Sequence, residues 1–401
     1  MSLGSDLIRA CQKGEVAPTD LSKEIKVILT LMTKFQTILK IVYESFKLLL
    51  HFVLVNAERN SWLILLNGGV VVITRAMGVH EQDAGVQTLG CGVLHSLSTS
   101  AAHKELVLRD PNVVMFEGVR AVLAALTHHP GDARLAGLAL SSLQNMSFNE
   151  RSSEFIAGLG GADCILSAMR AHPDDPDVQA PAGWCLLNMS ANGPELKLVI
   201  AGCGGVAALV AALVAHPRDR DVLAPCAGAL HSLATRCPPN KALAADAGAA
   251  ALLVAAIREH WTDPAVVRPA VWALQTLAAD HPPNAARLAA AGAVPILLRL
   301  VVAHAAAGGP GAVDILRPAC WALESVVASD SEAARAARGD RACAPAVLAL
   351  RSLYRAAPAD AVIVALLRAL DADQVAAETS AAASEGSAAA AAEPRRTSVF
   401  L

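Results

Sequence analysis

The chain is poor in aromatic residues and carries little net charge. Phe, Trp and Tyr make up 3% of its 401 residues, and the formal net charge is −3. A charge this close to neutral argues against a dedicated nucleic-acid-binding protein, which needs a basic surface. The chain is instead 54% apolar, with alanine and leucine prominent, a composition that favours close-packed helices over β-sheets.

Sequence motifs for metal binding and catalysis are missing as well. The nine cysteines contain no C-x-x-C pair, and Cys91, Cys185 and Cys320 fall on predicted apolar helix faces. We interpret them as buried hydrophobic residues in a reducing compartment, with the cytoplasm as the predicted location and the nucleus as the alternative. The chain has no phosphate-binding loop, nucleophile elbow or His-Glu metal helix. The sequence therefore predicts no enzymatic activity, catalytic residue, cofactor or metal.

The first 57 residues differ from the rest of the chain. They hold six of the nine lysines, and they open without the basic and apolar regions of a signal peptide. Apolar residues at helical spacing predict one long or two short amphipathic helices over residues 21–55, interrupted by charges that rule out a membrane span. We expect residues 1–57 to form an N-terminal helical cap on the first repeat. The alternative is a helix that docks on a membrane or on the cytoskeleton through its lysines.

A repeat organises the remainder. His129-Pro130, His172-Pro173 and His216-Pro217 are followed by His260 and His304, at intervals of 43–44 residues. Such a period is typical of stacked helical repeats, which bury their apolar faces against one another. Each unit divides into three helices, with a glycine turn between the first two and a His-Pro loop before the third. The third helices are predicted at 83–99, 132–147, 177–191, 220–235, 263–279, 313–328 and 359–370.

Local residues in these units allow further predictions. The loop histidines recur one to a repeat, which would place them about 10 Å apart, too far to share one metal ion. We expect each to bond free carbonyls at the end of its own helix. Asp177 is the predicted N-cap of its helix, and Pro181 is predicted to bend that helix or to start it.

The third helices carry the motif of a known family. Trp184-Cys-Leu-Leu-Asn188, Trp272-Ala-Leu-Gln-Thr276 and Trp321-Ala-Leu-Glu-Ser325 resemble the armadillo repeat, and the His-Pro loops are most similar to the armadillo region of leucine-rich-repeat kinases. This resemblance implies an all-α, right-handed, armadillo/HEAT-like superhelical solenoid of six to seven three-helix repeats. The solenoid would span residues 58–370, between the N-terminal cap and a disordered Ala/Ser-rich tail at 371–401.

The resemblance also implies a function, because armadillo proteins bind peptides or partner surfaces along the groove lined by third helices. We therefore expect a monomeric, non-enzymatic scaffold for a protein or an extended peptide, and neither a nucleic acid nor a membrane as its main partner. Residues four apart share a helix face and define the candidate groove. The candidate partner-binding residues are Ser141, Asn145, Trp184, Asn188, Ser232, Trp272, Thr276, Trp321 and Ser325.

The end of the chain holds two short motifs. Arg395-Arg-Thr-Ser398 marks Ser398 as a candidate phosphosite, and Val399-Phe-Leu401 has the ending that PDZ domains bind. Two alternative functions stay open at this stage. The chain could be a membrane or cytoskeletal tether, or an armadillo fragment of a larger signalling protein.

Overall fold

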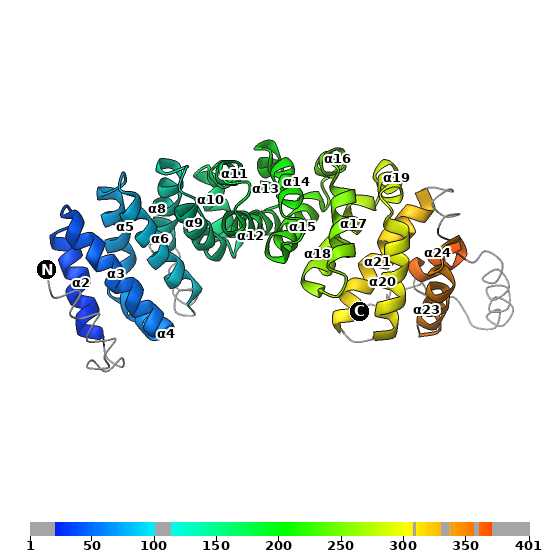
Figure 1. Ribbon diagram of the computed structural model, residues 1–401, viewed down its shortest axis with the longest axis horizontal. Coiled ribbons are helices and arrows are strands. Elements are labelled where there is room, and N and C mark those ends of the chain that lie inside the picture. The colour runs from blue at the N-terminus through cyan, green and yellow to red at the C-terminus, as the bar shows by residue number, and fades with distance from the viewer. Residues whose placement is uncertain are drawn as a thin grey trace, which may run out of the picture. The chain divides into compact units, whose positions relative to one another are not determined.

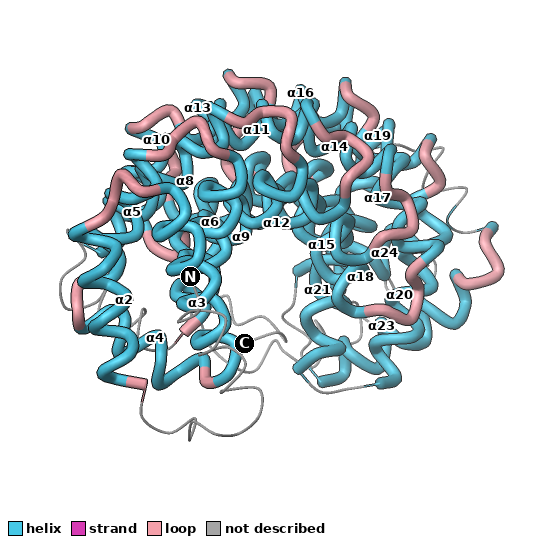
Figure 2. The backbone as a smooth tube through the Cα atoms, turned by 60° about the vertical axis from the view of Figure 1, so that its left-hand side comes forward, coloured by secondary structure: helices cyan, strands magenta, loops and turns pink. Residues whose placement is uncertain are grey.

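The computed structural model describes residues 21–100, 114–307, 310–329, 337, 339–356 and 361–370. These residues form helices joined by short turns, with no strand among them (Figure 2). The chain divides into two compact units, residues 1–208 and 209–401, which we describe one at a time. The predicted tail, with Ser398 and the ending at 399–401, lies outside the described residues.

The first unit consists of helices in repeating sets (Figure 1). They are α2 (Ser22–Lys34), α3 (Leu39–Val55), α4 (Ala57–Leu66), α5 (Gly69–Val79), α6 (Ala84–Thr99), α8 (Val114–His128), α9 (Ala133–Met146), α10 (Glu150–Gly158), α11 (Gly161–Ala171), α12 (Pro176–Asn192) and α13 (Leu196–Gly202). Helix α14 (Gly205–Ala215) contains the boundary between the units.

The second unit continues the same succession. Its helices are α15 (Arg220–Ala234), α16 (Pro238–Asp246), α17 (Ala249–Glu259), α18 (Pro264–Ala278), α19 (Pro282–Ala290), α20 (Ala293–Ala307), α21 (Pro310–Ser329), α23 (Cys343–Ala356) and α24 (Ala361–Leu370). The predicted all-α architecture is therefore confirmed for the described residues.

A glycine makes the sharp turn between the first and second helices of a repeat. Gly160 has φ 75°, a left-handed conformation that L side chains rarely adopt. At Gly161 a Cβ would lie 2.6 Å from the carbonyl oxygen of Ile156, so the chain can double back tightly there. Comparable junctions bend by 78° between α4 and α5 and by 86° between α19 and α20.

Aspartates start the third helices. Each accepts a hydrogen bond from a backbone N–H in the first turn, which satisfies a donor that the helix itself leaves unpaired. The caps are Asp83, Asp132, Asp175, Asp219 and Asp263. The prediction that Asp177 caps its helix is wrong. Asp175 is the cap and Pro176 follows as the first helical residue, a position where the missing N–H costs nothing.

The third helices stack side by side within each unit. In the first unit α3, α6, α9 and α12 pack in succession, and in the second α15, α18, α21 and α24 do the same. The second helices α5, α8 and α11 form a separate row outside α6, α9 and α12 (Figure 2). Leu186, Leu274 and Leu323, next to the tryptophan positions, are completely buried in these stacks.

The amphipathic N-terminal segment forms two helices, α2 and α3. Helix α2 packs against α5 and α3 packs against α6, so they take the places of a second and a third helix. Ile25 and Met32 of α2 and Phe46 of α3 are completely buried. The segment predicted as a cap is thus built like the last two helices of a repeat.

Three of the loop histidines, His80, His129 and His172, connect neighbouring repeats. His80 Nε2 lies 2.8 Å from the carbonyl oxygen of Gln36, and His129 Nε2 lies 2.8 Å from that of Glu81. His172 Nε2 lies 2.9 Å from the carbonyl oxygen of Pro130. These carbonyls belong to the preceding repeat, so the predicted bonds to the histidine's own helix are wrong. A glutamine fills that role instead, because Gln179 Nε2 donates to Met169 O and His172 O at the end of α11.

Among the described residues, no single helix is long and apolar enough to cross a membrane. Four bent pairs of helices pass that test together by length and composition alone.

One proline of a third helix, Pro181, lies beside a close contact between two third helices. Pro181 lies inside α12, which begins five residues earlier, so the prediction that the helix starts at the proline is wrong. Proline has no N–H, and it therefore leaves the carbonyl of Asp177, four residues before, without its helical donor. A Cβ on Gly137 of α9 would lie 2.9 Å from that carbonyl oxygen. Gly137 therefore allows α9 and α12 to approach.

Replacing Gly137 with alanine should destabilise the protein by about 1–3 kcal/mol, because backbone must move to relieve the overlap. The matched control is Gly92→Ala in α6, where the new Cβ meets nothing closer than 3.8 Å. There the better helix propensity of alanine should leave stability unchanged or raise it by up to about 1 kcal/mol. Chemical denaturation of both variants measures the difference, and equal stability would contradict the close-contact argument.

Candidate functional site

The third-helix face presents tryptophan side chains to solvent. Trp184 on α12 is 39% exposed, while Trp272 on α18 and Trp321 on α21 are half-buried. The leucine two residues after each tryptophan is the core residue, so the indole is not needed to fill the interior. An indole in this position offers a wall for aliphatic stems or cations.

The asparagines of the predicted site are turned toward the preceding repeat. Asn145 Nδ2 donates to Ser98 Oγ at 3.1 Å. Asn188 Nδ2 donates to Ser147 Oγ at 3.1 Å and to the carbonyl oxygen of Gln144 at 3.2 Å. Each amide nitrogen is therefore used to join third helices. The side-chain amide oxygen of Asn188, Oδ1, has no hydrogen-bond partner among the described residues. It therefore remains able to accept a hydrogen bond from a ligand.

Two histidines take part in the same contacts, and the sequence interpretation missed them. His231 Nδ1 lies 2.6 Å from Thr276 Oγ1 and 3.2 Å from the carbonyl oxygen of Trp272, and its ring centroid lies 5.5 Å from that of Trp272. His95 lies near the backbone of Ser141 in the next repeat, but its Nδ1 is buried without a hydrogen-bond partner among the described residues. Both histidines occur in the sequence Gly-x-Leu-His-Ser-Leu, with glycine in place of the tryptophan. This shared hexapeptide is the sequence signal by which both histidines could have been predicted.

Charged groups gather at one end of the face in the second unit. Lys241 Nζ of α16 donates to the carbonyl oxygen of Ala279 at 2.6 Å. Burial, and then the charge of Asp280, raises the pKa of the Glu324 carboxyl. Burial lowers the pKa of Lys241, and Asp280 partly opposes that shift. The Arg317 guanidinium lies 4.3 Å from the centre of the Trp321 ring. The face near Trp321 therefore carries both positively and negatively charged side chains.

The nine predicted residues do not share one environment. Ser141, Asn145, Trp184 and Asn188 belong to the first unit, and Ser232, Trp272, Thr276, Trp321 and Ser325 belong to the second. Ser232 and Thr276 are buried, and the Ser325 hydroxyl donates to the carbonyl oxygen of Trp321. The tryptophans and the asparagine oxygens are thus the groups best placed to meet a partner. Their binding role stays a prediction.

Burial makes the cysteine thiols of the third helices unreactive. Cys91, Cys185 and Cys320 are fully buried, as the sequence predicts. Burial raises the pKa of the Cys91 and Cys226 thiols to about 12, so both stay protonated at neutral pH. Among the described residues, no group of three or more His, Cys, Asp or Glu side chains is arranged to hold a metal ion.

Acidification should weaken the first unit through His95. Burial lowers the pKa of folded His95, and the nearby Ser141 backbone only partly opposes this. The unfolded chain therefore binds protons at higher pH than the folded chain, and stability is lost as the pH falls from about 6.5 towards the lower folded pKa. We expect the melting temperature of His95→Gln to fall less between pH 7.5 and 5.5 than that of the wild type.

The control for this measurement is His128→Gln, which replaces an exposed histidine of α8. It should show the same acid sensitivity as the wild type. If His95→Gln is as acid-sensitive as the control, His95 does not contribute to the pH dependence.

Comparison with known proteins agrees with this architecture. The solved structures that resemble the chain include an engineered protein of the Northeast Structural Genomics Consortium, with a TM-score of 0.58 and 20% identity over 86% of this chain and 88% of that one. A designed armadillo repeat protein matches with a TM-score of 0.50 and 20% identity, over 64% of this chain and all of its own length. At such identity these likenesses show the fold alone.

The sequence comparisons are more specific. No significant match was found among the sequences of curated proteins. The family profile described as LRRK2 ARM repeat matches residues 21–297, which include α2 and α3 of the segment predicted as a cap. The chain therefore belongs to the LRRK2 armadillo-repeat family.

Proposed function

We propose that the protein is a non-enzymatic scaffold that binds an extended segment of another protein along its third-helix face. The observation that carries this proposal is the exposure of Trp184 on a helix whose core positions are filled by other residues. A tryptophan held in place by buried neighbours can cover a ligand without losing much side-chain entropy on binding.

The polar groups beside the tryptophans support an extended ligand. The Asn188 amide nitrogen is fixed by two bonds to the preceding repeat, so its oxygen is held in one orientation. An extended peptide presents backbone N–H groups, which can donate hydrogen bonds to such an oxygen. The His231 ring of the neighbouring helix α15 similarly packs against the Trp272 indole, and its Nδ1 is fixed 2.6 Å from Thr276 Oγ1. The face is therefore preorganised, which lowers the entropic cost of binding.

The proposal commits the protein to a cytoplasmic role with a protein partner. The protein partner is supported by the armadillo fold, the exposed Trp184 and the fixed amides. A monomer is the state proposed, because the binding face is assembled within one chain.

Substitution of Trp184 or Trp272 by alanine should weaken partner binding at least tenfold, because truncating a tryptophan that anchors an interface costs about 2 kcal/mol or more. Ligands for the assay can be selected from a displayed library of random peptides with the full chain as bait. Fluorescence anisotropy of a selected peptide then gives the dissociation constant for each variant.

The matched control is Trp62→Ala, which removes a half-buried tryptophan of α4, outside the third helices. Circular dichroism should show the same helix content for all three variants. Peptides that bind Trp184→Ala and Trp272→Ala as tightly as the wild type would show that the third-helix face is not the binding surface.

A further inference from the structure

A pocket lies between the second helices α17 and α20 of the second unit, apart from the third helices. Its volume is about 510 Å³, and it is lined by Arg258, Trp261, Gly292, Pro295, Ile296 and Arg299. Helix α17 supplies Arg258, the loop after it supplies Trp261, and the remaining residues come from the first turns of α20 and the glycine before it. Two guanidinium groups and one indole thus share a single cavity.

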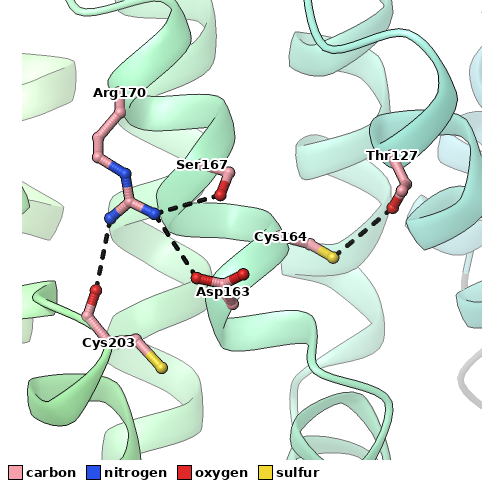
Figure 3. Close-up of polar contacts among 6 residues, drawn as sticks. All are labelled: Thr127, Asp163, Cys164, Ser167, Arg170 and Cys203. Carbon is pink, nitrogen blue, oxygen red and sulfur yellow. Dashed lines mark hydrogen bonds and ion pairs between the residues drawn. The ribbon is translucent and has the colours of Figure 1, made fainter.

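An arginine at the equivalent position in the first unit is paired with neighbouring groups. Arg170 in the last turn of α11 donates to Ser167 Oγ at 3.2 Å and to the carbonyl oxygen of Cys203 at 3.4 Å (Figure 3). Its guanidinium also lies 3.6 Å from Asp163 Oδ1. The cation is therefore held by its own helix and by the turn of the next repeat.

Arg258 occupies the same position two repeats later but has lost these partners. The residues seven and three before it are Ala251 and Ala255, where Arg170 has Asp163 and Ser167. Its guanidinium still reaches toward the next repeat, because a Cβ on Gly292 would lie 3.9 Å from Arg258 Nη2. The helix supplies no carboxylate to pair with it.

Nearby carboxylates are already paired with other arginines. Glu259 Oε1 lies 3.3 Å from Arg218 Nε, and Asp263 Oδ2 lies 3.4 Å from Arg220 Nη1. Arg258 and Arg299 have no hydrogen bond or ion pair with another residue in the part of the chain that the structure describes. Both side chains are exposed, so neither is prevented from meeting a ligand.

The rest of the lining adds positive potential and an apolar wall. The pocket opens beside Gly292 and the first turn of α20, a helix of 15 residues whose positive end favours anions. Trp261, Pro295 and Ile296 supply apolar surface next to the guanidinium groups. A comparable pocket between α5 and α8 in the first unit includes Glu81 and Glu117 beside Arg120, so its lining is not purely basic.

We propose that this pocket binds a phosphate monoester attached to an aromatic ring, as in a phosphotyrosine side chain of a partner protein. Two arginines can hold the three acceptor oxygens of a phosphate through charge-assisted hydrogen bonds. The indole and the two aliphatic residues then cover the ring. A phosphoserine or a carboxylate would leave that apolar wall uncovered. This site is separate from the third-helix face and does not depend on the function proposed for it.

The test uses the full chain and a fluorescein-labelled peptide, Ala-Ala-phosphotyrosine-Ala-Ala, in a fluorescence-anisotropy titration. We expect saturable binding that inorganic phosphate displaces, with weaker binding of the phosphoserine peptide and none of the unphosphorylated one. Arg258→Gln and Arg299→Gln should each weaken binding about tenfold to a hundredfold. Trp261→Ala should bring the affinity for phosphotyrosine down to that for phosphoserine.

Two kinds of control keep the outcome decisive. Arg170→Gln removes the equivalent but paired arginine and should leave the affinity unchanged, as should Trp184→Ala on the third-helix face. The proposal is overturned if the phosphotyrosine peptide shows no saturable binding to the wild type. It is equally overturned if Arg258→Gln and Arg299→Gln bind as the wild type does, or if adenosine monophosphate binds and the peptide does not.

Discussion

The structure depends on the burial of each third helix between the third helices of its neighbours. No repeat can bury its own apolar face alone, so each needs the next at a fixed distance. Leu186, Leu274 and Leu323 are fully buried only because of this stacking. His80, His129, His172 and the close contact at Gly137 all join neighbouring repeats.

This constraint decides which groups remain available for binding. Polar groups at the seams between repeats are used to satisfy one another, as the Asn188 amide and the Ser147 hydroxyl show. What remains on the third-helix face is the surface of the tryptophans and a few acceptor oxygens. The row of second helices is less constrained, since its exposed positions can change without disturbing the stack. Arg170 and Arg258 illustrate this freedom, because one position is neutralised and the other is left charged.

Much of the helical pattern could be predicted from sequence because its signals are local. Helix α18 was predicted at 263–279 and spans Pro264–Ala278, since an aspartate cap and a proline mark its start. Errors arose where two local signals compete. Asp175 and Asp177 flank Pro176, and the position of the proline decides between them. For the candidate site, Trp184 is exposed, but Thr276 is buried and His231 was missed, because both depend on contacts about one repeat away.

The sequence by itself determined the all-α repeat, its period and the positions of the tryptophans on the third helices, because spacing along the chain controls helix faces and turns. Only the tertiary structure decided which polar groups were satisfied. The partners of His172, Asn188 and His231 lie 41–45 residues away in sequence. Only the stacking of neighbouring repeats brings them within hydrogen-bonding distance. Arg258 and Arg299, which have no hydrogen bond or ion pair with another described residue, were likewise recognised by the residues that surround them in space.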